Sequence, residues 1–245
     1  STDYAGHQFG PNSIEIEDMY LRLDKEIGDY LNFLDKYVGR GKYLFFLTAD
    51  HGAAHNPQFL TDEDLPAGVM NKGITEDLNQ YLKAKNGHDS IVNGFVNYQF
   101  YLDEQLIAKN GLDREKIKKE IEEFLSKKQE ITYVVDLEHL SNAVLPEPLK
   151  AMVINGYHRQ RSGVIQVVLN PAWYENNGAT TGTTHGTWNP YDSHIPLLWY
   201  GWHVPRGQSN RVVNMTDIAA TLAAMLHVQQ PNGCIGVPIE GVIGM

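Results

Sequence analysis

The chain has 245 residues, of which 42% are hydrophobic and 20% are charged. This composition is typical of a folded protein with a substantial core and excludes a disordered chain. The formal net charge of −10 argues against a nucleic-acid polymer as a partner, because sequence-independent binding to phosphate groups needs a basic surface.

The single cysteine, Cys234, excludes an intrachain disulfide and a cysteine-based metal cluster. The longest apolar runs are far shorter than the ~20 residues of a membrane-spanning helix, so we expect no membrane span. The chain starts at Ser1, without a methionine and without the charged and apolar regions of a signal peptide. We therefore expect a processed chain or a fragment.

The first part of the chain predicts a loop, a helix and a strand. Residues 1–13 are rich in Gly, Ser and Asn, which is typical of a loop. Apolar side chains then recur at steps of three and four residues as far as Leu34, which predicts an amphipathic helix that ends near Gly39. The apolar run at residues 42–49 predicts a strand that is buried on both faces.

The middle of the chain predicts a separate α+β lobe. An irregular loop over residues 55–71 comes first. The apolar periodicity then predicts helices at 76–85, 113–128 and 147–157, and strands at 90–102 and 131–137. The charged face of the helix at 113–128 is expected to be solvated.

The last part of the chain predicts a return to the first sheet. Residues 163–170 and 195–200 predict buried strands, and residues 216–226 predict an alanine-rich helix. The long polar loop at 174–192 has the length of a functional loop. We therefore expect a metal-site part of an α/β core, an inserted lobe and the rest of the core at residues 1–85, 86–160 and 161–245.

Asp50 and His51 follow the predicted strand directly. In open α/β sheets, ligands bind beyond the carboxyl ends of the strands, and both side chains can bind a divalent metal. The alternative is a solvated Asp-His pair that only ends a strand. The dipeptide by itself does not separate the two interpretations.

Two further positions offer metal ligands. Asp3 and His7 can reach one ion from a single helical turn or from a loop. His185 lies among small residues that allow a close approach of a ligand. For each position the alternative is an ordinary polar residue that binds nothing, because polar loops often contain Asp and His.

Taken together, three motifs resemble the alkaline phosphatase superfamily, and they occur in a fixed order: Asp3-x-x-x-His7, Asp50–His51–Gly52 and His185–Gly186–Thr187. The residues around them are similar to bacterial alkaline phosphatases that are related to the type I phosphodiesterase and nucleotide pyrophosphatase branch. The resemblance extends to Asn214–Thr221 and covers nearly the whole chain. It implies the C-terminal part of an α/β/α sandwich with an inserted α+β lobe.

The resemblance also implies two zinc ions in the full-length enzyme. Asp3, His7 and His185 would bind the first zinc. Asp50 and His51 would be two ligands of the second zinc, whose site is incomplete in this chain. Such a pair of ions stabilises the attacking and leaving oxygens when a phosphate ester is hydrolysed. The implied reaction is hydrolysis of a small phosphate monoester through a phosphorylated Thr or Ser.

The same resemblance places the nucleophile and the phosphate-binding residues upstream of Asp3, so no catalytic residue is assigned within this chain. We expect these residues alone to be inactive. The alternatives are a phosphodiesterase or nucleotide pyrophosphatase on the same fold, and a non-catalytic metal-binding domain. The resemblance further implies a periplasmic or secreted protein, and nothing in the sequence indicates its oligomeric state.

Residues near the third motif have two interpretations. Asp192 and His194 are candidates to orient metal ligands, and the alternative is that they cap the strand at 195–200. Aromatic side chains near this loop could line the mouth of a substrate site, but packing against the strands is the simpler expectation for Trp173, Tyr174, Trp188 and Tyr191.

Overall fold

The computed structural model describes residues 1–175 and 181–243. The chain divides into two compact units: unit 1 comprises Ser1–Met19 and His51–His194, and unit 2 comprises Tyr20–Asp50 and Ile195–Met245. The chain crosses from one unit to the other three times, after Met19, Asp50 and His194. Part of the predicted loop at 174–192, residues 176–180, lies outside the described residues.

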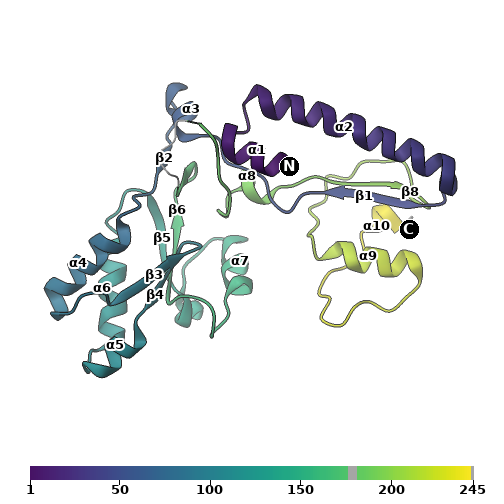
Figure 1. The fold of residues 1–245 in the computed structure, drawn as a ribbon. Helices are drawn as coiled ribbons and strands as arrows, with labels where there is room; N and C mark the ends of the chain where they lie inside the picture. Colours follow the sequence, from purple (N-terminus) through teal and green to yellow (C-terminus); the bar gives the residue numbers. More distant parts are fainter. Residues whose placement is uncertain (176–180, 244–245) are drawn as a thin grey trace. The chain divides into compact units, whose positions relative to one another are not determined.

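Unit 1 contains most of the helices and strands (Figure 1). Its helices are α1 (Thr2–Phe9), α3 (Pro57–Asp62), α4 (Ile74–Asn86), α5 (Glu104–Lys109), α6 (Arg114–Leu125), α7 (Leu149–Gly156) and α8 (Pro190–Ser193). Its strands are β2 (Gly68–Val69), β3 (Val92–Val96), β4 (Gln99–Leu102), β5 (Ile131–Asp136), β6 (Ile165–Leu169) and β7 (Trp173–Tyr174). The main sheet has the order β3-β4-β6-β5, with antiparallel neighbours, while β2 and β7 form a short parallel pair.

The core of unit 1 lies between this sheet and the helices α4 and α6. On α6, Ile117, Ile121 and Leu125 repeat every four residues, so they form one apolar stripe, and all three are fully buried. Every residue of β6 is buried. The sequence predicted that β6 belongs to the same sheet as residues 42–49, and that prediction is wrong. The strand lies inside the lobe because it pairs with β4 and β5.

Residues 90–102 form a hairpin instead of the single predicted strand. Asn97 and Tyr98 both have positive φ angles, 51° and 61°, and they make the two-residue turn between β3 and β4. Turns of this kind match the right-handed twist of the paired strands. A short helix, α3, also lies within the predicted loop at 55–71. The Asn56 side chain caps it by accepting a hydrogen bond of 2.9 Å from the Gln58 N–H, and Pro57 is its first residue.

Unit 2 is built around a two-stranded antiparallel sheet. Its elements are the later part of α2 (Ile14–Leu34), a π-helical turn at Asp35–Gly39, β1 (Leu44–Thr48), β8 (Leu197–Gly201), α9 (Asp217–Leu226) and α10 (Glu240–Ile243). The strand β1 was expected to be buried on both faces, but Phe46 at its centre is 38% exposed. Among the described residues, β1 pairs only with β8.

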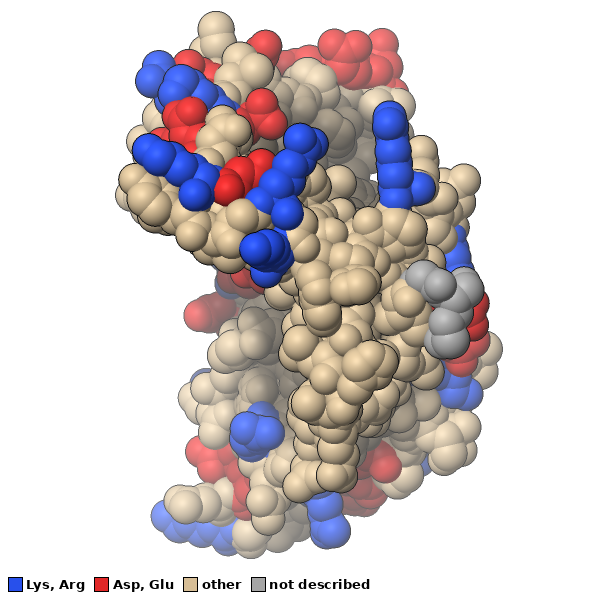
Figure 2. Space-filling view, turned by 90° about the vertical axis from the view of Figure 1, so that its right-hand side faces the viewer, with Lys and Arg blue, Asp and Glu red and all other residues tan. Residues whose placement is uncertain are grey.

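The surface of unit 2 carries few charges near its C-terminal half. Residues 212–239 contain a single charged side chain, Asp217. Figure 2 shows a broad area without Lys, Arg, Asp or Glu on the side that it draws, with charged side chains gathered mainly above and at the margins. None of the described helices is both long enough and apolar enough to cross a membrane.

Candidate metal centre

The first two predicted ligands lie on a helix. Residues 2–9 form α1, although their composition predicted a loop. The Ser1 hydroxyl caps the helix by accepting a hydrogen bond from the Tyr4 backbone N–H, and Ala5 is buried. A helical turn places residues four apart on one face, so Asp3 Oδ1 lies 3.5 Å from His7 Nε2.

Backbone carbonyls orient two of the histidines. His7 Nδ1 lies 2.9 Å from the Thr183 carbonyl oxygen, and His51 Nδ1 lies 2.8 Å from the Gly52 carbonyl oxygen. A carbonyl can only accept, so in each ring Nδ1 donates its proton and Nε2 carries the lone pair. Both Nε2 atoms face Asp3, because His51 Nε2 lies 3.6 Å from Asp3 Oδ1. This tautomer is the one that a metal ligand needs.

His185 completes the cluster. Its ring stacks on His51 with 3.4 Å between centroids, and its centroid lies 5.1 Å from that of His7. One ligand atom from each of Asp3, His51 and His185 lies within 4.8 Å of the other two. Burial lowers the pKa of His185, and the two neighbouring imidazoles lower it further. The low pKa keeps His185 neutral, which is the state that binds a metal.

The structure therefore brings Asp3, His7, His51 and His185 together within unit 1. Asp50 belongs to unit 2. One residue separates it from Thr48, the last residue of β1, so it follows the strand as the sequence predicted. The group of ligand atoms that lie within 4.8 Å of one another combines Asp3 and His185 with His51, whereas the predicted partition assigned His51 to the other ion. That partition remains a prediction.

Two glycines allow the ligand loops to approach each other. A Cβ atom on Gly52 would lie 2.0 Å from the Tyr191 carbonyl oxygen, and one on Gly182 would lie 2.4 Å from the His7 carbonyl oxygen. Any side chain at either position would push these backbones apart. The Gly52 N–H also donates a hydrogen bond of 2.7 Å to the Asp192 carbonyl oxygen. The segment after His51 is thus held against the segment that includes Asp192.

Asp192 is buried, with 4% of its surface exposed. Its Oδ2 accepts hydrogen bonds from the Thr187 backbone N–H at 2.7 Å and from the Thr187 hydroxyl at 2.6 Å. His194 is exposed, and its backbone N–H donates to the Pro190 carbonyl oxygen at 2.8 Å. The supporting roles of Thr183 and Thr187 were not predicted. Their places on either side of His185 were the only signal in the sequence.

A second cluster of potential ligands lies on α6, at the end of β5 and in the segment that follows β5. Ligand atoms of Glu115, Asp136 and His139 also lie within 4.8 Å of one another. The Lys118 ammonium lies 2.8 Å from Asp136 and 3.2 Å from Glu115, so a positive charge already neutralises this group. Lys118 is only 1% exposed, which corrects the prediction that the whole charged face of this helix is solvated.

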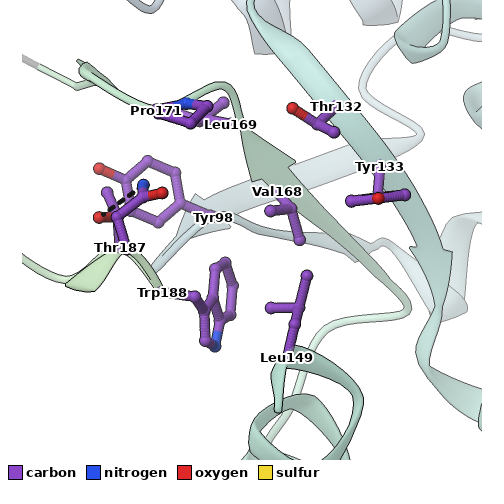
Figure 3. Close-up of a pocket in the computed structure, with 10 residues that line it drawn as sticks. Tyr98, Thr132, Tyr133, Leu149, Val168, Leu169, Pro171, Thr187 and Trp188 are labelled. Atoms are coloured by element: carbon purple, nitrogen blue, oxygen red, sulfur yellow. Dashed lines mark hydrogen bonds between the residues drawn. The ribbon is translucent and has the colours of Figure 1, made fainter. Parts of the chain in front are cut away.

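The aromatic residues near the third motif mostly serve packing. Tyr174 is fully buried, Trp173 packs on the main core, and the Tyr191 hydroxyl accepts hydrogen bonds from Ala172 and Asn189. Trp188 packs against the small cluster around Val135, Leu137 and Val153, and it also lines a cavity of about 170 Å³, in which it faces the side chains of Leu149 and Val168 (Figure 3).

Comparisons with known proteins show the family of this chain. The model of the family described as type I phosphodiesterase / nucleotide pyrophosphatase matches residues 1–192. Alkaline phosphatase PafA from Elizabethkingia meningoseptica is 45% identical over 100% of this chain and 44% of its own length. A protein named calcium-transporting ATPase from Myroides odoratus is also 45% identical, and alkaline phosphatase PhoV from Synechococcus elongatus is 43% identical; each is matched over 99% of this chain and 44% of the relative.

Solved structures support the fold. The crystal structure of wild-type PafA matches with a TM-score of 0.95 at 45% identity, over 100% of this chain and 46% of that chain. Human ectonucleotide pyrophosphatase / phosphodiesterase 5 shares the fold at 20% identity, with a TM-score of 0.62. This confirms the predicted alkaline-phosphatase-like α/β fold. The chain spans less than half the length of the curated relatives that it matches, and it belongs to the type I phosphodiesterase / nucleotide pyrophosphatase family.

Proposed function

We propose that the protein containing this chain is a zinc-dependent hydrolase of small phosphate monoesters. The observation that carries the proposal is the convergence of Asp3 Oδ1 with Nε2 of His7 and of His51, next to the His185 ring. A mixed set of carboxylate and imidazole ligands suits a hydrolytic zinc ion. Relatives named alkaline phosphatases, at 43% and 45% identity, support the monoester substrate.

The residues of this chain would bind and orient the metal. His7 and His51 present Nε2 because backbone carbonyls accept the protons on their Nδ1 atoms. His185 stays neutral because burial lowers its pKa, and Asp3 contributes negative charge between two imidazoles. When bound, the zinc ions would act as Lewis acids on the phosphate oxygens. In the proposal, Asp50, which directly precedes His51 in the sequence, is a further ligand.

The nucleophile of the proposed reaction, a Thr or Ser that becomes phosphorylated, lies in a part of the protein outside residues 1–245. This assignment rests on the resemblance of the motifs and on the 44% share of the relatives that the chain covers. The same resemblance suggests a periplasmic or secreted location, which fractionation of the source cells would test. Enzyme confined to the cytoplasm would contradict that part of the proposal.

A second candidate is a phosphodiesterase or nucleotide pyrophosphatase. The match of residues 1–192 to the family model with this description favours it. Rates on a monoester and a diester with the same leaving group, measured with the whole protein, separate the two candidates. We expect the monoester to react faster, and faster cleavage of the diester would favour the second candidate.

The first test measures zinc content and activity in variants of the whole protein. We expect Asp3→Asn and His185→Ala each to weaken zinc binding by at least about 10- to 100-fold, with a matching loss of phosphatase activity. Removing a residue that only hydrogen-bonds to a metal ligand already has an effect of this size, and these two residues are proposed to bind the metal directly. His158→Ala removes an exposed histidine of the same unit and should change neither quantity. Unchanged zinc content and activity in Asp3→Asn would contradict the metal site.

A second test uses residues 1–245 alone. We expect at most about one bound zinc and no turnover of phosphate esters, because the proposed nucleophile and one ligand are missing. Two tightly bound zinc ions would show that the ligand partition is wrong. Zinc-dependent turnover would show that the nucleophile lies within this chain.

A further inference from the structure

His185 differs from the other two histidines of the cluster in its hydrogen bonding. In His7 and His51, the nitrogen on the far side from Asp3 donates to a backbone carbonyl. Within the described part of the chain, no hydrogen bond is found for the His185 ring. Histidines that bind a metal almost always donate their second ring N–H to an acceptor, which sets the tautomer and the ring orientation. His185 therefore lacks one partner that its proposed role requires.

Asp192 has the complementary deficit. Its Oδ2 accepts two hydrogen bonds from Thr187, but its Oδ1 is buried and has no hydrogen-bond donor among the described residues. A buried carboxylate oxygen without a donor is costly, so such atoms usually mark a partner that binds later or a functional role. Thr187, which donates both hydrogen bonds to Oδ2, lies two residues after His185 in the sequence. A buried acceptor without a donor and a ring N–H without an acceptor thus belong to the same short segment, residues 185–192.

We propose that Asp192 is the positioning residue for His185: when zinc binds, the second ring N–H of His185 donates to Asp192 Oδ1. This inference rests on the proposed metal site. Asp192 would then connect three parts of the centre, because its Oδ2 holds Thr187, two residues after His185, and its backbone oxygen holds Gly52, directly after His51. The carboxylate would fix the ring of His185 and make it a stronger zinc ligand.

The chain offers a matched control for this role. Asp217 in unit 2 is also a buried aspartate whose carboxylate accepts hydrogen bonds from backbone N–H groups, those of Asn214 at 2.9 Å and Val237 at 3.0 Å. Replacing either aspartate by asparagine removes a buried charge and keeps one acceptor oxygen. In Asp192→Asn, that oxygen can still accept from Thr187, but the amide NH₂ would replace Oδ1 and cannot accept a proton from His185.

The test is a chelator competition that measures the zinc dissociation constant of the whole protein. We expect Asp192→Asn to raise this constant 10- to 100-fold and Asp217→Asn to change it less than about threefold, even if both variants lower the melting temperature. Equal effects of the two substitutions, or a change of less than threefold in Asp192→Asn, would overturn the inference. Wild-type protein that binds no zinc would overturn the proposed function, and this inference with it.

A measurement on the wild-type protein covers the case in which Asp192→Asn does not fold. In zinc-loaded protein with ¹⁵N-labelled histidine, we expect three ring N–H protons that exchange slowly with water, from His7, His51 and His185. A His185 ring proton that exchanges as fast as that of exposed His158 would contradict the hydrogen bond to Asp192.

Discussion

The two units of the chain differ in how much apolar surface they bury. Among the described residues, unit 1 contains a large cluster of buried side chains between the four-stranded sheet and its helices, and a small one around Val135, Leu137 and Val153. In unit 2 the buried apolar side chains that the structure describes are few: Ala220, Ala223, Met225 and Val242. Large apolar side chains of unit 2 are exposed instead, including those of Tyr37, Leu198, Val212 and Ile235.

This difference shows that a regular backbone does not by itself make a stable unit. Burial of apolar surface is the dominant favourable term in folding, and a two-stranded sheet alone is marginally stable in water. Unit 1 has the burial that an independent lobe needs. Unit 2 has the strands and helices of a sheet layer without a comparable core, and the chain spans only 44% of the length of its relatives. We expect the two units to respond differently to the same substitution.

The largest contrast should come from removing one phenylalanine from each sheet. Phe100 on β4 is fully buried, so Phe100→Ala should destabilise unit 1 by about 3–5 kcal/mol. Phe46 on β1 is 38% exposed, and Phe46→Ala should cost less than about 1.5 kcal/mol. Hydrogen exchange followed by mass spectrometry reports the stability of each unit separately. Equal losses in the two variants would mean that unit 2 is as well packed as unit 1.

A smaller effect is expected from the buried charge of unit 1. Lys118→Met would leave Asp136 and Glu138 without the ammonium group that lies 2.8 Å and 2.9 Å from them. We expect a loss of about 2–3 kcal/mol, less than for a fully buried pair, because both carboxylates reach solvent. Lys127→Met, which removes an exposed lysine just after α6, is the control and should leave urea unfolding unchanged.

The same cluster predicts a pH dependence. Burial would raise the pKa of Asp136, but hydrogen bonds from Lys118 and His139 outweigh it, and hydrogen bonds from Arg114 lower the pKa of Glu138. Lowered values in the folded state mean that the carboxylates stabilise unit 1 above pH ~4, and that this stability is lost as the pH falls through the folded-state pKa values. The urea midpoint of the wild type should therefore fall below pH ~4, and the fall should be smaller in Lys118→Met. An equal fall in both proteins would exclude Lys118 as its cause.

The smallest effect on stability should come from the apolar surface of unit 2. Leu198 is 57% exposed, so Leu198→Lys should change the free energy of unfolding by no more than about 0.5 kcal/mol. It should, however, reduce self-association of residues 1–245, measured by light scattering, because exposed apolar patches promote aggregation. Val144→Lys, at an exposed position of unit 1, is the control. A similar reduction in both variants would point to net charge and not to the surface of unit 2.

Local patterns in the sequence determined a large part of this protein. The stripe of Ile117, Ile121 and Leu125 predicted α6, and the apolar run before Asp50 predicted β1. The order of the three motifs indicated the family. These features were predictable because helix periodicity, strand composition and motif spacing depend only on residues that are close together in the sequence.

Only the tertiary structure decided which elements share a sheet and which polar groups meet. Three features depend on contacts that form only in the folded chain. They are the placement of β6 beside β4 and β5, the burial of Lys118, and the contact of Asp192 with Thr187. The helical state of residues 2–9 also depends on such contacts, since their Gly-containing sequence is a weak helix former. Hydrogen bonds and burial between distant segments leave no periodic signal along the chain, so their physical effect appears only once the chain is folded.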